Sequence, residues 1–357
     1  MTSGSSPLDA EDLRARVQKR LDEFLAQQLP VLDDVSPDLA PLSDAVTDLL
    51  RGGKRLRPAF AYWGWRGAGG ADCEGAIAAA TSLELLQACA LIHDDVMDAS
   101  DTRRGMPAAH RRFATLHRGN EWLGSPEAFG VGAAILLGDL CLSWADELLM
   151  SCGLPKDAVM RGKPVYDVMR TELMGGQYLD LLEQAMGGGS EARAMRVVRF
   201  KAAKYTIERP LHLGAALAGA PEATFVAYSG YGLPLGEAFQ LRDDVLGVFG
   251  DPAQTGKPAG DDLREGKRTV LVAAAVEASS PAQAALIRRH LGDPALDAHG
   301  IAALREVITA TGALSHVERL IDALTSQCFA ALDAAEIDDH ARNVLRGLAH
   351  AATSRSM

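Results

Sequence analysis

Two groups of aspartates have the residue type and spacing best suited to chemistry. The first lies in the run LIHDDVMD and contains Asp94, Asp95 and Asp98, and the second lies in FQLRDD and contains Asp243 and Asp244. Asp94 and Asp98 share one face of a helix, where like charges repel, and the dipole at a helix C-terminus disfavours both. Mg²⁺ prefers such oxygen ligands, completed by waters and phosphates. Together the groups predict several Mg²⁺ ions bridged by a diphosphate, whereas one such group alone is equally typical of a solvated helix end.

Two basic runs accompany these aspartates. GGKRLRP brings Lys54, Arg55 and Arg57 together, and DTRRG follows the first aspartate group with Arg103 and Arg104. Arginine offers a fork of donors that matches phosphate oxygens, and lysine adds a point charge. Each run alone is typical of an exposed surface, but beside the aspartates both predict clamps for a diphosphate.

A third polar segment, TGKPAGDDLREGK, mixes glycine with acidic and basic residues at 255–267. It lacks the GxxxxGK[ST] pattern of a P-loop, and no predicted strand precedes it. It predicts a mobile cationic lid over phosphates, with an ordinary exposed loop as the alternative.

Helices must position these groups, because apolar residues recur at three- and four-residue spacing along most of the chain. Signals for β-strands are scarce, and aromatic residues make up only 5% of the chain. The stretch 131–150 is apolar almost all round, which predicts a central buried helix. The predicted helices cover 9–29 with Asp9 as N-cap, 39–50, 58–66, 73–98, 131–150, 155–186, 191–218, 222–249, 268–278, 281–291, 299–311, 314–335 and 338–351.

Length and composition indicate one all-α domain. The chain has 357 residues, of which 48% are hydrophobic and 23% are charged, values typical of a protein with a real core. No repeat or linker divides it, so residues 8–352 are predicted to form a single all-helical domain behind a disordered tail at 1–7. The net charge of −11 argues against a nucleic-acid partner, whose usual footprint is a basic patch.

The cysteines and the N-terminus bear on the compartment. Five cysteines, an odd number with no Cys-x-x-Cys spacing, indicate reduced thiols rather than disulfides or a zinc site. The N-terminus lacks the features of a signal peptide, and no apolar run approaches the roughly 18 residues of a membrane helix. We therefore expect a cytoplasmic protein without membrane insertion.

The motifs, in this order, resemble those of the trans-isoprenyl diphosphate synthases (the polyprenyl synthetase family), with geranylgeranyl-diphosphate-synthase-like features. They are GGKRLRP, LIHDDVMD, DTRRG, GQYLDL at 176–181, FQLRDD and GKPAGDDLREGK. The resemblance implies a helical bundle around a deep central cavity, with the two aspartate motifs facing each other at its mouth. It also implies a trans-prenyltransferase that condenses isopentenyl diphosphate head to tail with allylic diphosphates, and a homodimer.

The resemblance further implies a role for individual residues. The ligands of about three Mg²⁺ ions per active site, with Mn²⁺ as a substitute, are Asp94, Asp98 and Asp243, supported through water by Asp95 and Asp244. Arg103 and Lys201 hold the allylic diphosphate, helped by Lys257 and Lys267, and Thr206 is a further candidate for this diphosphate. The residues that bind isopentenyl diphosphate are Lys54, Arg57, Gln87 and Arg104. Gln240 stabilises the allylic cation, and no protein nucleophile is needed.

Two positions depart from the family's pattern. The fifth position of the second aspartate motif is Gly247 instead of aspartate, and Asp251 one turn further on is a contributor in its place. The residue after Lys201 is alanine where the family has threonine. Either Thr206 replaces that hydroxyl or Lys204 is the true ligand.

Product length should depend on the residues that precede the first aspartate motif on its helix. One and two turns before Asp94 lie Ala90, Cys89 and Leu86, and each turn adds about 5.4 Å, comparable to one isoprene unit. In the family, aromatic residues near these positions stop growth early. The small Cys89 and Ala90 favour geranylgeranyl diphosphate, with Leu86 and Leu83 as the floor, while farnesyl and longer polyprenyl products are the alternatives.

Two rival classes share parts of this pattern. A terpene cyclase has the same fold, but its second metal site usually carries an Asn/Ser/Glu pattern instead of Asp243 and Asp244, and it does not need Lys54 and Arg57. A non-catalytic regulatory subunit of a prenyl synthase would be expected to have lost an aspartate motif. The presence of both motifs favours the synthase.

Overall fold

The computed structural model describes residues 7–188, 190–251 and 260–353. The first compact unit consists of the described residues up to Tyr62 together with Ala71–Val159. The second consists of Trp63–Gly70 together with the described residues from Met160 onward. The prediction of one domain over 8–352 stays a prediction. The predicted tail at 1–7 lies outside the described residues except for Pro7, which begins a 3-10 segment and is not part of a disordered tail.

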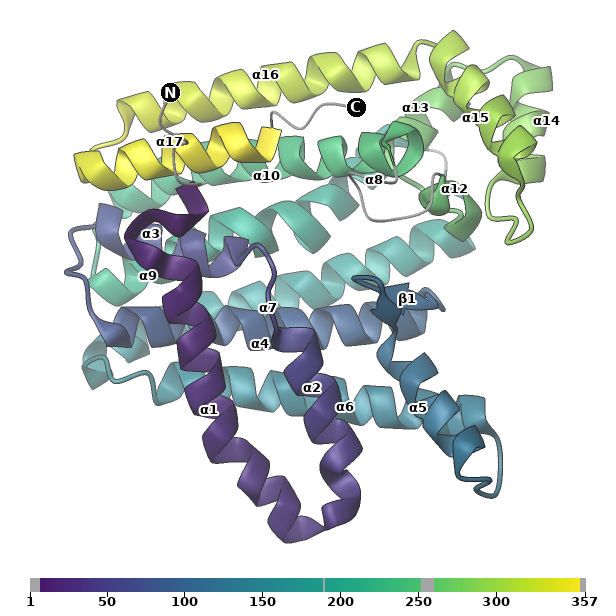
Figure 1. Cartoon of the computed structure of the whole chain (residues 1–357). Coiled ribbons are helices and arrows are strands. Elements are labelled where there is room, and N and C mark those ends of the chain that lie inside the picture. The colour runs from purple at the N-terminus through teal and green to yellow at the C-terminus, as the bar shows by residue number, and fades with distance from the viewer. Residues whose placement is uncertain (1–6, 189, 252–259, 354–357) are drawn as a thin grey trace, which may run out of the picture. The chain divides into compact units, whose positions relative to one another are not determined.

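The first unit is built around α4 (Glu74–Met97), which packs against α6 (Pro126–Met150) and α1 (Leu13–Val35). Figure 1 shows α4 and α6 side by side. Gly138 permits this approach, because a Cβ there would lie 2.1 Å from Nε2 of His93. The other elements are η1 (Pro7–Asp12), η2 (Pro37–Leu39), α2 (Ala40–Leu50), β1 (Thr102–Arg103), β2 (Met106–Pro107), α5 (Ala109–Gly119) and the start of α3 (Leu56–Gly67).

The second unit is built around α10 (Glu222–Phe249), which packs against α16 (Ala313–Ala334) and the π-helical segment η3 (Val198–Glu208). Leu241 and Val245 of α10 are fully buried in a core that includes Leu271 and Val317. The other elements are α8 (Glu191–Val197), α9 (Arg209–Ala218), α12 (Asp261–Glu265), α13 (Val270–Glu277), α14 (Pro281–His290), α15 (Ala298–Ala310), α17 (Asp339–Thr353) and most of α7 (Lys156–Ala185).

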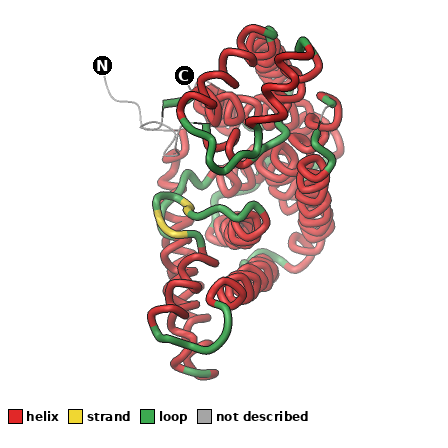
Figure 2. Tube along the Cα trace, turned by 90° about the vertical axis from the view of Figure 1, so that its right-hand side faces the viewer, coloured by secondary structure: helices red, strands yellow, loops and turns green. Residues whose placement is uncertain are grey.

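The predicted all-α class is confirmed, since Figure 2 shows helices almost throughout the described chain and a short antiparallel pair of strands. A helix occupies each predicted range, with shifted bounds. α1 begins at Leu13, so Asp9 is not its N-cap and instead pairs with Arg14. The sequence did not predict α5, α12, the strand pair or the π-helical register of η3.

The strand pair ends in a two-residue turn at Arg104 and Gly105. Both residues have positive φ, 54° and 76°, the combination of a type I′ hairpin turn. Arg103 pairs with Met106 across the hairpin. The turn therefore places Arg103 and Arg104 at consecutive positions of one short hairpin directly after α4.

Two helices among the described residues, α4 and α6, are long and apolar enough to cross a membrane by length and composition alone. The expectation that no segment reaches this length is therefore wrong. In α4, 78% of the apolar stretch is buried, as in a core helix, whereas in α6 only 39% is buried. The predicted burial of 131–150 on all sides is also wrong, because Ile135 and Leu136 are exposed by 43% and 64%.

Candidate active site

The first aspartate group ends α4, where the backbone N–H of Asp98 donates to the carbonyl oxygen of Asp94 at 2.8 Å. Asp95 is 2% exposed. Burial raises its pKa, and the hydrogen bond from Arg103 opposes that shift. Nε of Arg103 donates to Oδ1 of Asp95 at 2.9 Å, and the guanidinium lies 3.6 Å from Oδ2 of Asp94. The hairpin thus brings a predicted diphosphate ligand against the predicted metal ligands.

Arg104 lies where the two basic runs meet. Its guanidinium approaches Gly53, where a Cβ would be 3.3 Å from NH2 of Arg104. Desolvation lowers the pKa of Arg104, the charge of Glu84 opposes this shift, and the nearby charges of Arg55, Arg103 and Arg57 add to it. Guanidinium groups from both runs therefore share one region of the first unit, where an anion would relieve their repulsion.

Arg55 has a different role from its neighbours in GGKRLRP. Arg55 is 3% exposed and forms a buried ion pair with Glu84 of α4, which is 5% exposed. Its guanidinium also donates to Oε1 of Gln18 at 2.6 Å and to the carbonyl oxygen of Leu50 at 2.5 Å. Lys54, directly before it, is exposed. The buried pair anchors the loop from which Lys54 projects.

The residues predicted to set product length differ in their surroundings. Leu86 and Cys89 are buried, at 1% and 3% exposure, whereas Ala90 is half-buried. Sγ of Cys89 lies 3.7 Å from Nδ1 of His93, whose Nε2 lies 3.1 Å from the carbonyl oxygen of Ile135 on α6. Burial raises the pKa of the Cys89 thiol to about 12, so it stays protonated. Cys89 therefore belongs to the packing of α4 against α6, while Ala90 shares a helix face with the aspartates one turn on.

η3 carries both lysines that were candidates for the allylic diphosphate. Nζ of Lys201 lies 2.6 Å from Oδ2 of Asp180, and Nζ of Lys204 lies 3.0 Å from Oε1 of Glu172, both acids being on α7. The side chain of Lys201 is 25% exposed and that of Lys204 is 15% exposed. Because a diphosphate must reach the ammonium group from solvent, the more exposed Lys201 is favoured as the ligand of the allylic diphosphate. Thr206 is buried, at 4% exposure.

The π-helical register of η3 is supported by two close backbone contacts. A Cβ at Gly176 of α7 would lie 2.4 Å from the backbone nitrogen of Lys201, and one at Gly236 of α10 would lie 2.6 Å from Cα of Ala203. Glycine at both positions lets the neighbouring helices touch the backbone of η3. Helical segments of this kind are rare and occur often at functional sites.

The second aspartate group lies near the end of α10. Nε2 of Gln240 donates to Oδ1 of Asp244 at 2.9 Å, a hydrogen bond that does not use the amide oxygen predicted to face the allylic cation. Burial raises the pKa of Asp244 to about 8, and the charges of Asp262 and Asp243 contribute to the shift. A buried carboxyl beside two carboxylates is a position that a cation would stabilise.

The raised pKa of Asp244 predicts a pH dependence of stability. Because its folded-state value of about 8 exceeds the ordinary 3.8, the folded protein binds more protons than the unfolded chain between these values. The stabilisation is therefore fully present below about pH 4 and is lost as the pH rises to about 8. In metal-free buffer, we expect the free energy of unfolding of the wild type to fall relative to Asp244→Asn across this window, measured by urea unfolding. Parallel pH profiles would contradict the prediction.

The predicted lid is described only in part. Lys257 and the rest of residues 252–259 lie outside the described residues. Nζ of Lys267 lies 3.2 Å from Oδ1 of Asp262 and 2.7 Å from Oε2 of Glu265. The described end of the segment is thus a short helix, α12, joined by ion pairs to the predicted diphosphate ligand Lys267.

The structure brings the predicted residues together within each unit. In the first unit, Arg103 contacts the aspartates at the end of α4, and the charge of Arg103 acts on Arg104. The side-chain oxygen of Gln87 is buried with no hydrogen-bond partner among the described residues. In the second unit, Gln240, Asp243, Asp244 and Lys267 lie close together. The chemical role of each of these residues stays a prediction.

Sequence reasoning assigned Arg55 to a diphosphate clamp, but the structure pairs it with Glu84 in the interior. It missed three residues of these neighbourhoods, which are Glu84, Asp180 beside Lys201, and Asp262 beside Lys267. Glu84 had a usable signal, because a lone charge within the apolar run of α4 is seldom buried unless it is paired. Asp180 lies inside the GQYLDL motif, but its partner is 21 residues away along the chain.

The donor set fits Mg²⁺. Each aspartate group combines adjacent carboxylates with partial burial, which a divalent cation compensates. Within the ranges that the structure describes, no three His, Cys, Asp or Glu side chains are arranged to hold a metal by themselves. Mg²⁺ takes one or two carboxylates and completes its shell with waters and diphosphate oxygens, so each pair of neighbouring aspartates offers enough donors from the protein.

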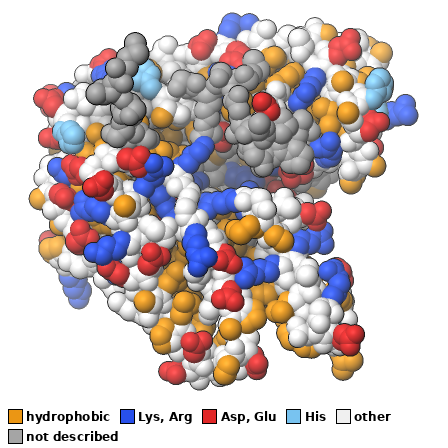
Figure 3. All heavy atoms as spheres, in the orientation of Figure 1, with side chains coloured by type: hydrophobic (Ala, Val, Ile, Leu, Met, Phe, Trp, Pro, Cys, Tyr) orange, Lys and Arg blue, Asp and Glu red, His pale blue; other side chains and the backbone are white. Residues whose placement is uncertain are grey.

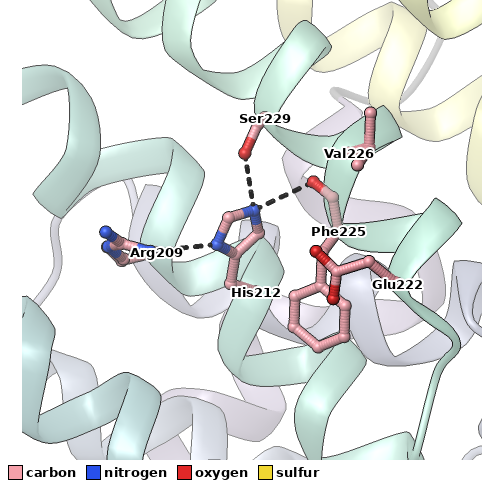
Figure 4. Close-up of a pocket in the computed structure, with 6 residues that line it drawn as sticks. All are labelled: Arg209, His212, Glu222, Phe225, Val226 and Ser229. Atoms are coloured by element: carbon pink, nitrogen blue, oxygen red, sulfur yellow. Dashed lines mark hydrogen bonds between the residues drawn. The ribbon is translucent and has the colours of Figure 1, made fainter.

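A hollow of about 390 Å³ elsewhere in the second unit contains none of the predicted residues (Figure 4). Oγ of Ser229 lies 3.0 Å from Nε2 of His212 there, a contact that resembles an activated nucleophile. However, Arg209, which can only donate, lies 3.2 Å from Nδ1 of His212. Burial lowers the pKa of His212, so the ring is neutral, accepts at Nδ1 and carries its proton on Nε2. His212 therefore cannot deprotonate Ser229.

Comparisons with known proteins agree on one family. The family model described as polyprenyl synthetase matches residues 40–308. The geranylfarnesyl diphosphate synthase of Aeropyrum pernix is 33% identical to this chain, and the match covers 80% of this chain and 84% of that protein. The octaprenyl diphosphate synthase of Escherichia coli is 30% identical, and the match covers 94% of this chain and 98% of that protein. The solved geranylgeranyl pyrophosphate synthase of Corynebacterium glutamicum, complexed with isoprenyl diphosphate and magnesium, is 46% identical over 96% of this chain and 99% of that one, with a TM-score of 0.91.

Proposed function

The chain belongs to the polyprenyl synthetase family and is a trans-prenyltransferase, and from this premise we propose that it joins isopentenyl diphosphate to an allylic diphosphate to make geranylgeranyl diphosphate. The observation that carries the proposal is the contact of Arg103 with Asp94 and Asp95 beside Arg104. Cations next to metal-binding carboxylates suit a diphosphate held both directly and through metal.

The reaction needs a stabilised leaving group rather than a protein nucleophile. The bond between the allylic carbon and its diphosphate oxygen breaks, and both electrons leave with the diphosphate. Arg103 and Lys201 provide positive charge where this negative charge develops, and Gln240 offers its amide oxygen to the allylic cation. The double bond of isopentenyl diphosphate then attacks the cation, and a proton is lost to the released diphosphate.

The metal sites follow from the two aspartate groups. Asp94, Asp98 and Asp243 would hold about three Mg²⁺ ions, with Mn²⁺ as a substitute. Mg²⁺ supplies Lewis-acid stabilisation of the departing diphosphate when bound. Asp95 and Asp244 are buried, and their hydrogen bonds with Arg103 and Gln240 orient the neighbouring ligands.

A product assay tests the proposed function. Purified protein with Mg²⁺ receives isopentenyl diphosphate and, in separate reactions, dimethylallyl, geranyl or farnesyl diphosphate, and the dephosphorylated alcohols are separated by chromatography. Geranylgeraniol is the expected main product. A farnesol or longer product would keep the reaction class and overturn the product length, and no condensation with any starter would support a cyclase or a regulatory subunit.

Ala90→Phe is expected to shorten the product. Ala90 is half-buried and shares a face of α4 with Asp94, so a phenyl ring there would occupy the first turn below the metal-binding end. We expect farnesol to replace geranylgeraniol as the main alcohol in the same assay. Cys89→Ala is the matched control, since Cys89 contacts His93 instead. An equal shift in both variants would contradict the assignment of Ala90 to the cavity wall.

We also propose that a second copy of the chain covers the exposed apolar face of α6. Phe129, Ile135 and Leu136 are exposed by 40%, 43% and 64%, and hydrophobic side chains reach the surface where α5 and α6 lie in Figure 3. Asp139 is exposed near the middle of the same helix, and its carboxylate would cost about 2.5–3.5 kcal/mol near the centre of a bilayer. This charge favours a protein partner and a cytoplasmic enzyme over membrane insertion.

The oligomeric state is measured by light scattering. We expect twice the mass of one chain for the wild type and the mass of one chain for Leu136→Lys, because a charge at the centre of a buried apolar face lacks a partner. A wild-type protein with the mass of one chain would contradict the dimer.

A further inference from the structure

Two of the five cysteines lie near each other in the first unit, at the end of α4 opposite the aspartates. α4 and α6 pack together and run in opposite directions (Figure 1), so the start of α4 lies beside the end of α6. Cys73 is the N-cap residue of α4, and Cys152 follows shortly after the end of α6. A Cβ at Gly75 would lie 3.1 Å from the backbone nitrogen of Leu154. The segments that carry the two cysteines are therefore in contact.

The thiol of Cys152 has a neighbourhood suited to redox chemistry. Cys152 is 6% exposed, and burial raises the pKa of its thiol. The backbone N–H groups of Leu154 and of Cys152 itself oppose this shift, because they donate to the sulfur. The charge of Cys73 raises the pKa of Cys152, and that of Arg20 on α1 lowers it. Cys152 is thus close enough to Cys73 to interact with it, and hydrogen-bond donors and an arginine lie around its sulfur.

Cys73 is the more accessible of the two cysteines. It is half-buried, and its side chain forms no capping hydrogen bond with α4. The acidic residues on either side of it, Asp72 and Glu74, both pair with Arg16 of α1, at 2.8 and 2.9 Å. A small oxidant can therefore reach Cys73 without approaching two uncompensated carboxylates.

We propose that Cys73 and Cys152 are a redox pair that closes to an intramolecular disulfide when the protein meets a hydroperoxide. Sγ of Cys73 attacks the distal oxygen of the hydroperoxide, the O–O bond breaks, and the departing oxygen takes up the thiol proton. Sγ of Cys152 then attacks the sulfenic sulfur of Cys73, the S–O bond breaks, and the hydroxyl group leaves as water with the proton of Cys152. The hydroperoxide gains the two electrons that the two thiols lose.

The disulfide would join the start of α4 to the end of α6, and a dithiol would reopen it by thiol–disulfide exchange. Both cysteines are free thiols in the structure, which is the reduced form of the pair. The inference does not depend on the identity of the substrate, because neither cysteine belongs to the candidate active site.

The test is a count of free thiols after oxidation. The wild type is treated with hydrogen peroxide, the oxidant is removed, and the thiols are counted with dithionitrobenzoate in denaturant. We expect the five thiols to fall to three, and dithiothreitol to restore all five. Peptide mass mapping should find the peptide of Cys73 joined to that of Cys152. The oxidised form should also unfold at a temperature several degrees higher, because the cross-link constrains the unfolded chain.

Two variants complete the experiment. In Cys152→Ser, oxidation should stop at the sulfenic acid of Cys73, which dimedone labels, and the rise in unfolding temperature should be lost. Cys328→Ser is the matched control, since Cys328 is a buried cysteine of the second unit, and it should still form the cross-link. Five thiols in the oxidised wild type, a disulfide between two chains or between other cysteines, or an equal rise in unfolding temperature in Cys152→Ser would each overturn the proposal.

Discussion

Glu84→Ala is expected to lower the free energy of unfolding by about 3–5 kcal/mol, since it leaves a buried guanidinium without its counterion. Glu84 is 5% exposed and Arg55 is 3% exposed, so water cannot replace the lost carboxylate. The two remaining acceptors of Arg55, on Gln18 and Leu50, are neutral and do not compensate its charge. Urea unfolding of the metal-free protein measures the change.

Glu74→Ala is the matched control for this prediction. Glu74 also pairs with an arginine, Arg16, at 2.9 Å, but its side chain is 77% exposed. Exposed pairs of this kind contribute about 0–1 kcal/mol. A loss in Glu84→Ala no larger than that in Glu74→Ala would contradict the idea that Arg55 is a structural anchor.

Asp94→Ala is expected to reduce condensation by about a thousandfold, equivalent to about 4 kcal/mol of transition-state stabilisation. Removing this carboxylate takes away a predicted metal ligand and leaves the neighbouring Arg103 with Asp95 as its acidic partner at this site. The measurement is the rate of condensation at saturating Mg²⁺.

Asp101→Ala is the control that shows whether the loss of condensation is specific to Asp94 or follows from removing any acidic residue in this region. Asp101 lies in the same region, but its side chain is 78% exposed and pairs with Arg111. We expect its rate to stay within a few-fold of the wild type, as is usual for exposed pairs. Comparable losses in both variants would argue that the acidic end of α4 serves folding and not the metal.

Most helices could be predicted because their apolar residues recur with the helical period, but α5 could not. Its buried side chains are His110, Phe113, Ala114 and His117. Two positions of its buried face are therefore histidines, which count as polar residues and interrupt the apolar pattern of the helix. The strand pair was missed for a related reason. Its turn is Arg104-Gly105, and arginine is not among the residues that usually adopt a positive φ.

The sequence also could not show what covers an apolar helix. The stretch 131–150 is apolar almost all round, which favours burial, yet Ile135 and Leu136 are exposed in the described chain. Hydrophobicity measures the free energy of removal from water, not the identity of the partner. A second copy of the chain would satisfy the same pattern.

The residue types of the candidate site could be predicted from the sequence, but the separate role of each residue could not. Arg55 and Arg57 are two residues apart in one basic run, and only burial shows that Arg55 is bound to Glu84. Likewise, Gly247 is a gap in an acidic motif when the chain is read in order. The carboxyl group of Asp262, which the chain carries to this place on α12, lies against Gly247 in the folded structure.

The register of η3 has a consequence for how this segment can evolve. Each residue of an ordinary helix turns the next by about 100°, so a π-helical stretch behaves as an α-helix that has absorbed an insertion. Losing one residue between Val198 and Glu208 would re-aim every side chain beyond the deletion. The segment would then be an α-helix, which is narrower than a π-helix. It would lose its close backbone contacts with Gly176 of α7 and Gly236 of α10. Insertions and deletions should therefore be rarer in this stretch than substitutions, and alignments of relatives should place gaps outside it.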